Sequence, residues 1–450
     1  MMSSWYPCPL AGAPGVLHIP DASRTVMPNG LSVVCIRKSG MPLATFHLVS
    51  RSGAGHDPDA MAGLGDACAA LLTAGTSRLT AKQFAEQVES LGGEMAGSVS
   101  RDHSVLAAEV LSWNQRGMLA LLFEAICDAQ YPDDEVSLYC ENALQTLSIN
   151  RSQPAFLASE AIAAALYGTH PYSRVAPDEG FLETAERDTL LPARSERWRP
   201  DRCVLVAVGD IDPEGLLNDL AALSGGWQAG ATDPFLVPPV TEPARRQVIV
   251  VNRPGSVQVN LAIGMLAPEA AHPDALALDV LNCVLGGRTG SRLFLNVRER
   301  LGYAYSVGSR YSSNLNMASW MMSAQTRTDA AADAAREMLD ESERLRTGGV
   351  TDAEVAAAKS YMDGVFCMKL GTQSGLAALL EGIEVFGLAQ DRIHTYRDRL
   401  RTVDTDEIQR VASRWLKPAD MAVVAVGDAE ALAGAMSQFG QVSVVEPGSA

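Results

Sequence analysis

The 450-residue chain lacks the features that mark export, membrane insertion and binding to polyanions. Its first residues include neither a basic nor an apolar segment of the secretory kind, and no run approaches the roughly 18 apolar residues of a membrane span. Basic residues are scarce: 36 Lys and Arg stand against 53 Asp and Glu, for a net charge of −17. We therefore expect a cytoplasmic protein that binds no nucleic acid and no membrane.

Clustered metal ligands are also missing from the sequence. The eight cysteines are far apart, with no C-x-x-C pair, and are predicted to be buried thiols. The seven histidines offer no pair at helical spacing, and His56 and His103 are assigned structural or solvated roles. The chain therefore has no evident metal site built from these residue types.

What is present is a pattern of short apolar strands and amphipathic helices. The predicted strands lie at residues 31–36, 44–49, 104–110, 204–208, 247–251 and 257–263. Turn residues between the first two strands suggest a connected pair. Thr80 with Gln83, and Thr351 with Glu354, form capping boxes that each predict the start of a helix.

The chain contains an internal repeat. R-W-R-P-D at residues 197–201 leads into V-A-V-G-D at 206–210, and R-W-L-K-P-A-D at 414–420 leads into a second V-A-V-G-D at 424–428. Residues 225–243 are rich in proline and glycine and are interpreted as a linker. We expect two homologous α+β domains, residues 20–225 and 244–450, each a mainly antiparallel sheet packed with helices.

One stretch, residues 285–307, carries the strongest chemical hint. An apolar helix over 275–285 should stop at Gly286-Gly287 in a positive-φ conformation, and Gly290 marks a flexible turn. In the next helix Leu293, Phe294, Val297 and Leu301 form an apolar stripe, which leaves Arg298 outside it, with Tyr305 on the strand that follows. A guanidinium and a phenol could together grip a peptide carbonyl or a carboxylate. On spacing alone, a solvated arginine and a half-buried tyrosine are the preferred interpretation.

The sequence resembles the pitrilysin/insulinase-type zinc metallopeptidases, the inverzincins, from about residue 20 to about residue 440. The similarity is carried by L-G-G-R-T-G-S-R-L-F-L-N-V-R-E-R-L-G-Y-A-Y-S-V at 285–307, P-G-S-V-Q at 254–258 and G-T-H-P-Y at 168–172. In that family Arg298 and Tyr305 match residues that bind the substrate backbone near the scissile bond. The resemblance therefore favours a functional role for the pair, and it implies half of a two-chain clamshell.

The family's zinc motif, H-x-x-E-H with a distant glutamate, is degenerate here. The flanking G-L and G-T fix the register, so that Asp66 and Ala70 occupy the histidine positions and Ala69 that of the general base. Thr146 stands at the distal glutamate position. No cofactor is expected in this chain, and zinc is expected in a partner chain.

The resemblance implies a catalytically silent subunit of a heterodimeric zinc metallopeptidase. Its expected partners are a homologous zinc-bearing subunit and a peptide substrate, which Arg298 and Tyr305 would bind. The alternative is a non-proteolytic scaffold like the family's core proteins of respiratory complexes. A self-sufficient metallopeptidase would need a zinc site that the sequence does not supply.

Overall fold

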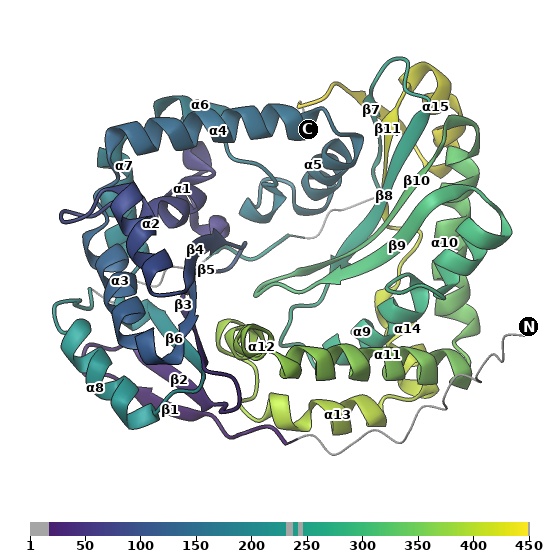
Figure 1. Ribbon diagram of the computed structural model, residues 1–450. Helices are drawn as coiled ribbons and strands as arrows, with labels where there is room; N and C mark the ends of the chain where they lie inside the picture. The colour runs from purple at the N-terminus through teal and green to yellow at the C-terminus, as the bar shows by residue number, and fades with distance from the viewer. Residues whose placement is uncertain (1–17, 231–236, 242–245, 449–450) are drawn as a thin grey trace, which may run out of the picture.

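The computed structural model describes residues 18–230, 237–241 and 246–448, in which the strands form two six-stranded sheets (Figure 1). The first sheet, in spatial order, consists of β1 (Ser23–Val26), β2 (Ser32–Arg37), β6 (Cys203–Gly209), β3 (Leu43–Ser50), β5 (Ser104–Leu111) and β4 (Glu94–Val99). The second consists of β12 (Val442–Val445), β7 (Val248–Asn252), β11 (Ala422–Gly427), β8 (Gln258–Ala267), β10 (Ala318–Arg327) and β9 (Ala304–Ser312).

Five strands of each sheet share one topology, which is the structural form of the sequence repeat. β2 is parallel to β6, and β6, β3, β5 and β4 then pair antiparallel. β7, β11, β8, β10 and β9 repeat the same order and directions. The repeated V-A-V-G-D lies at the ends of β6 and β11, which are buried at every position. Such full burial is expected of central strands that are covered on both faces.

One prediction about the first sheet was wrong. The strands at 31–36 and 44–49 are joined by a short turn but do not pair, because β6 lies between them and pairs with both. The N–H of Lys38 donates to the carbonyl of Gly209 at the end of β6 (2.7 Å), so the turn passes over that strand. The fully buried β6 takes the centre of the sheet, where both its faces are covered.

Helices cover both faces of each sheet. The helices of the first half are α1 (Leu64–Ala70), α2 (Ala81–Ser90), α3 (Gln115–Asp128), α4 (Asp133–Arg151), α5 (Pro154–Tyr167), α6 (Glu179–Thr184), α7 (Arg187–Arg197) and α8 (Pro213–Leu223). Those of the second half are α9 (Ala275–Leu285), α10 (Ala331–Gly348), α11 (Asp352–Gly371), α12 (Gln373–Val385), α13 (Arg392–Thr402), α14 (Thr405–Trp415) and α15 (Ala429–Met436). Both predicted capping boxes are formed, at the starts of α2 and α11.

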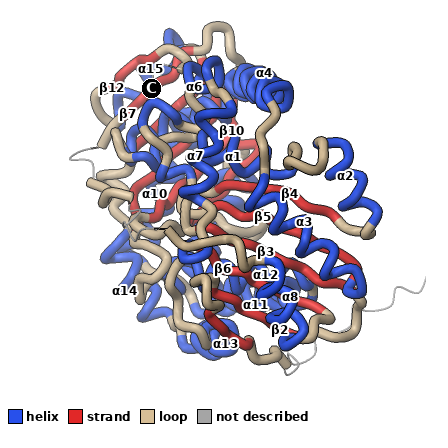
Figure 2. Tube along the Cα trace, turned by 90° about the vertical axis from the view of Figure 1, so that its left-hand side faces the viewer, coloured by secondary structure: helices blue, strands red, loops and turns tan. Residues whose placement is uncertain are grey.

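Each half supplies a helix that covers the sheet of the other half. Helix α12 packs on β3 and β6, where Leu376 and Leu380 join the apolar core of the first sheet (Figure 2). Helix α5 packs in the same way on β8 and β11, with Leu157 and Ile162 in the core of the second sheet. The two halves therefore share their hydrophobic cores, and neither half can bury its sheet without the other.

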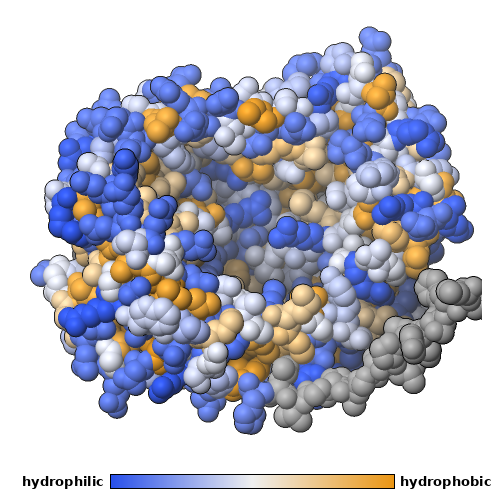
Figure 3. Space-filling view, viewed as in Figure 1, coloured by the Kyte–Doolittle hydropathy of each residue, from blue (hydrophilic) through white to orange (hydrophobic). Residues whose placement is uncertain are grey.

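Polar contacts around the β4–β5 turn and β3 also connect the first half to the second. Asp102, in this turn, accepts hydrogen bonds from the backbone N–H of Leu315 (3.0 Å) and from the hydroxyl of Tyr172. His47 on β3 and His103 after the turn both hydrogen-bond to Glu381 of α12, at 2.7 and 2.8 Å. Between the two halves the face of the molecule is hollowed, and both polar and apolar residues line the hollow (Figure 3).

The structure also bears on the sequence predictions about the cysteines, the linker and a membrane span. Among the cysteines that the structure describes, Cys127 is exposed and Cys367 is half-buried, contrary to prediction, whereas the others are buried; all are free thiols. Part of the predicted linker, 231–236 and 242–245, lies outside the described residues. The domain limits, 20–225 and 244–450, therefore stay a prediction. In the described part of the chain, no helix has the length and apolar character needed to cross a membrane.

Candidate functional site

Arg298 and Tyr305 lie together at the surface of the second half. The guanidinium carbon of Arg298 is 6.0 Å from the ring centre of Tyr305 and 4.7 Å from that of Phe294, within the range of cation–π attraction. Arg298 also forms an exposed ion pair with Glu299 (3.7 Å). Tyr305 is 79% exposed, far more than the half-buried side chain of the simpler interpretation. Both polar groups are thus free to meet a ligand.

A π-helix over Phe294–Arg300 presents the arginine, where the sequence predicted an α-helix. Its wide turn is seen in the hydrogen bond from the N–H of Leu301 to the carbonyl of Asn296, five residues back (3.0 Å). The predicted stripe therefore holds only in part: Leu293 and Val297 are fully buried, whereas Phe294 and Leu301 are half-buried. Single-turn π segments are frequent at functional sites.

The glycines before this helix serve close packing. Gly286 has a φ of −156°, so the predicted positive φ at the helix end was wrong. A Cβ on Gly286 would lie 2.4 Å from the N–H nitrogen of Ser309 on β9, and one on Gly287 would lie 2.9 Å from the side chain of Asn282. The loop thus lies directly on the strand that carries Tyr305. Gly290 has the positive φ, 90°, that its turn requires.

Three of the four degenerate metal positions, Asp66, Ala69 and Ala70, lie on helix α1. Asp66 and Ala70 are exposed there, and Ala69 is buried, its carbonyl against Gly97 of the edge strand β4. Methyl groups cannot ligate a metal. The two possible donors of this helix do not form a pair, because Asp66 is exposed whereas Cys68 is fully buried and donates to the carbonyl of Leu190, so these residues do not fit a zinc ion. Solvent reaches part of the Asp66 side chain, but the surrounding protein removes much of the water around its carboxyl group. This desolvation and the nearby Asp57 carboxylate raise the pKa of Asp66 to about 6, although the positive charge of Arg197 acts to lower it.

The repeated arginine of the R-W motif holds α1 in place. Arg197, almost fully buried, pairs with Asp57, whose carboxylate also accepts the N–H groups of Gly63 (2.9 Å) and Gly65 (3.0 Å) at the start of α1. In the second copy of the motif, Arg414 pairs with Asp274 (3.3 Å), the residue before α9. The two ion pairs anchor equivalent helices. The repeated R-W motif is the feature of the sequence that points to these two ion pairs.

Thr146 lies on α4, which runs beside α1. It is exposed and lines a pocket of about 290 Å³ with Tyr139, Asn142 and Phe156. Burial and the Asp66 carboxylate raise the pKa of Tyr139, so this phenol is close to the degenerate site. Across the described residues, no three His, Cys, Asp or Glu side chains gather in a way that could hold a metal ion.

Tyr305 lies away from the contact that joins β9 to the first half. The turn after β9 contacts the first half through Leu315 and Asp102, whereas Tyr305 lies at the other end of this nine-residue strand. At about 3.3 Å per residue that end is roughly 20 Å from the contact. Strand β9 is also the edge of its sheet and pairs only with β10 among the described strands. Arg298 and Tyr305 therefore lie at an exposed edge of the second sheet, at the end of β9 that is away from the contact between Leu315 and Asp102.

Comparison with known families gives two matches. Residues 32–176 match Insulinase (Peptidase family M16), and residues 184–362 match the Peptidase M16 inactive domain. A protein of Mycobacterium tuberculosis described as an uncharacterized zinc protease is 26% identical over 399 residues, covering 87% of this chain and 90% of that protein. A similarly described protein of Bacillus subtilis is 23% identical over 348 residues, covering 77% and 84%.

Two solved structures share the fold. One is a peptidase M16 inactive domain from Pseudomonas fluorescens, with a TM-score of 0.85 at 21% identity, over 91% of this chain and 98% of that chain. The other is a protease from Helicobacter pylori, with a TM-score of 0.83 at 19% identity, over 91% and 100%. Both carry the two-sheet architecture over nearly their whole length.

Proposed function

Because the chain belongs to the insulinase/pitrilysin-type family, peptidase family M16, we propose that it is the substrate-binding, catalytically silent subunit of a heterodimeric zinc metallopeptidase. The partner is a homologous chain with an intact H-x-x-E-H motif. Arg298 and Tyr305 bind the peptide backbone beside the partner's zinc. A cytoplasmic location, expected from the sequence, is part of the same proposal.

The observation that carries this proposal is the contrast between the two predicted sites. On helix α1 neither histidine position of the zinc motif holds a histidine, and Ala69 stands at the position of the general base, whereas Arg298 and Tyr305 remain side by side with both polar groups at the surface. A guanidinium and a phenol can donate several hydrogen bonds to a carbonyl and stabilise the charge that develops on it during attack. The position of Tyr305 on an exposed edge strand supports an action on another chain.

The scaffold alternative has one observation in its favour. Arg298 stacks on Phe294 and pairs with Glu299, contacts that also serve a purely structural surface. The exposure of Tyr305 favours the substrate-binding role, because a phenol that is 79% exposed contributes little to packing. A scaffold does not need that ring at the edge of its sheet.

The test is reconstitution with a zinc-bearing chain of the family and a fluorogenic peptide. Arg298→Ala should lower kcat/KM of the pair by about 10²–10³, since losing one oxyanion donor commonly costs this much. Tyr305→Phe removes only a hydroxyl and should cost less, mostly in kcat. The control is Arg300→Ala, which removes a guanidinium from the same helix end that contacts Asn296 and Glu337 instead. Wild-type rates for Arg298→Ala in an assembled pair would leave the scaffold function.

A further inference from the structure

A second pocket lies between α11, α12 and α13, apart from the residues discussed so far. Its volume is about 360 Å³, within the range of small-molecule sites. Phe366 of α11 and Tyr396 of α13 form one wall, with ring centres 4.3 Å apart, and Leu379 and Gly382 of α12 form the other. The pocket is therefore apolar and aromatic along most of its depth.

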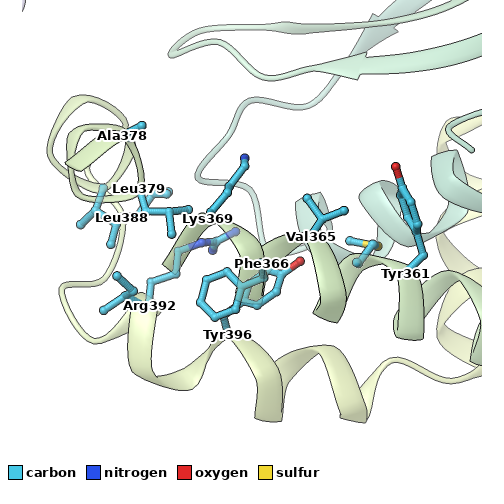
Figure 4. A pocket seen from close by; sticks show the side chains of 13 residues that line it. Tyr361, Val365, Phe366, Lys369, Ala378, Leu379, Leu388, Arg392 and Tyr396 are labelled. Carbon is cyan, nitrogen blue, oxygen red and sulfur yellow. The ribbon is translucent and has the colours of Figure 1, made fainter. Parts of the chain in front are cut away.

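Two cationic side chains line this apolar pocket. Figure 4 shows the guanidinium of Arg392 of α13 between Leu379 and the Phe366–Tyr396 pair, whereas the exposed Lys369 of α11 lies at the edge of the pocket and extends away from these rings. Among the residues that the structure describes, neither side chain forms a hydrogen bond or a close ion pair. Arg392 is also the first residue of α13, where the positive end of the helix dipole disfavours a cation. A half-buried guanidinium without a close partner is costly unless a ligand meets it.

The carboxylates of the surrounding helices do not neutralise these cations closely. Asp363 of α11 is held by Arg397 (2.6 Å), and Glu381 of α12 by His47 and His103. Asp279 of α9 attracts both Arg392 and Lys369 without forming a close ion pair with either, and burial raises the pKa of this carboxyl to about 7. Burial and the charge of Arg399 also lower the pKa of Arg392. The positive charge of the pocket is thus only partly compensated.

We propose that this pocket binds an amphipathic carboxylate, with the carboxylate on Arg392, the positive charge of Lys369 at the edge of the pocket, and the apolar body between Leu379 and the aromatic pair. Two sources share this chemistry: a free medium-chain acid, and the C-terminus of a peptide that ends in a large apolar residue. A guanidinium matches a carboxylate with two parallel hydrogen bonds, and the low polarity of the pocket strengthens them. The site is independent of Arg298 and Tyr305.

The test is calorimetric titration of the full chain, without any partner subunit. The probes are decanoate against decanamide, and acetyl-Ala-Ala-Phe with a free carboxylate against its C-terminal amide. We expect at least one acid to bind and its amide to bind about tenfold more weakly or not at all. Binding of decanoate alone identifies the free acid, and binding of the peptide alone identifies the peptide end. The proposal is overturned if neither acid binds, or if the amides bind equally well.

Three variants locate the site. Arg392→Gln should weaken acid binding about tenfold or more, whereas Arg401→Gln, an exposed arginine of the same helix that pairs with Asp398, should not. Gly382→Leu fills the apolar space and favours the helix, because a Cβ there meets only Phe386, at 4.0 Å. It should abolish binding without lowering the melting temperature. Unchanged affinity in both Arg392→Gln and Gly382→Leu would place the acid elsewhere and refute the proposal.

Discussion

Replacing Glu381 by alanine tests whether the two halves are locked together as the contacts suggest. This carboxylate of α12 accepts from His47 (2.7 Å) and His103 (2.8 Å) of the first half, and the three side chains are only 13–17% exposed. Burial acts to raise the pKa of Glu381, but the hydrogen bonds and charges of the two imidazoles outweigh it and lower the pKa from 4.5 to about 2. The folded state therefore favours the ionised carboxylate.

The size of the effect follows from that pKa. Since one pKa unit corresponds to about 1.4 kcal/mol, ionised Glu381 stabilises the fold by about 3 kcal/mol at neutral pH. A depressed acid pKa stabilises the fold above the unfolded value and loses this contribution as the pH falls through the folded value. The difference between wild type and Glu381→Ala should thus be about 3 kcal/mol at pH 7 and shrink steadily between about pH 4.5 and 2.

The assay is urea unfolding followed by circular dichroism, with both proteins measured at each pH. Glu381→Gln is the matched control, because its amide keeps the shape and can still hydrogen-bond both imidazoles without a charge. It should fall between the other two proteins at pH 7. If the free energies of unfolding of wild type and Glu381→Ala differ by less than about 1 kcal/mol at pH 7, or by an amount that does not change with pH, ionised Glu381 does not stabilise the fold as proposed.

Three further predictions follow. Elemental analysis of the dialysed chain should find no stoichiometric zinc, because Ala69, Ala70 and Thr146 offer no suitable ligand; about one zinc per chain that is lost in Asp66→Ala would contradict this. Asp66 should titrate near pH 6 in carbon-13 NMR spectra, and since its pKa is raised, ionisation disfavours the fold: Asp66→Asn should stabilise the protein above about pH 6 and have little effect below about pH 4, whereas a midpoint near 4 would count against it. Limited proteolysis should cut first within 225–243, yet the fragments should stay associated because α5 and α12 are exchanged; early cleavage within α10 or prompt dissociation would argue against both points.

The strands and helices could be predicted because their signals are local. The alternation of residues 257–263 and the capping box of Thr351 and Glu354 depend on nearby residues alone, and both elements are present. The order of strands was harder, because the place of β6 between β2 and β3 depends on burial over the whole sheet. The exchange of α5 and α12 gave no local signal at all, since an apolar helix face does not specify which sheet it covers.

The candidate site shows the same division. The spacing of Arg298 and Tyr305 gave no reason to expect contact, and only the resemblance to the family suggested that they act as a pair. In the structure the guanidinium carbon of Arg298 lies 6.0 Å from the ring centre of Tyr305. The π-turn was not predictable, because its stripe differs from that of an α-helix by a single residue. Arg197 and Asp57 are 140 residues apart in sequence, so no local pattern joins them. Lys369 and Arg392 likewise line one pocket only through the packing of α11 against α13.

The most direct test of the proposed function is to find where the peptide lies. A peptide substrate with a photoreactive group next to the scissile bond is cross-linked to the reconstituted pair, and the attachment sites are mapped by mass spectrometry. We expect cross-links to the segment of this chain from Arg298 to Tyr305. They should form only when the zinc-bearing partner is present and should be lost in Arg298→Ala. Cross-links confined to the partner chain, or unchanged in Arg298→Ala, would contradict the proposed function.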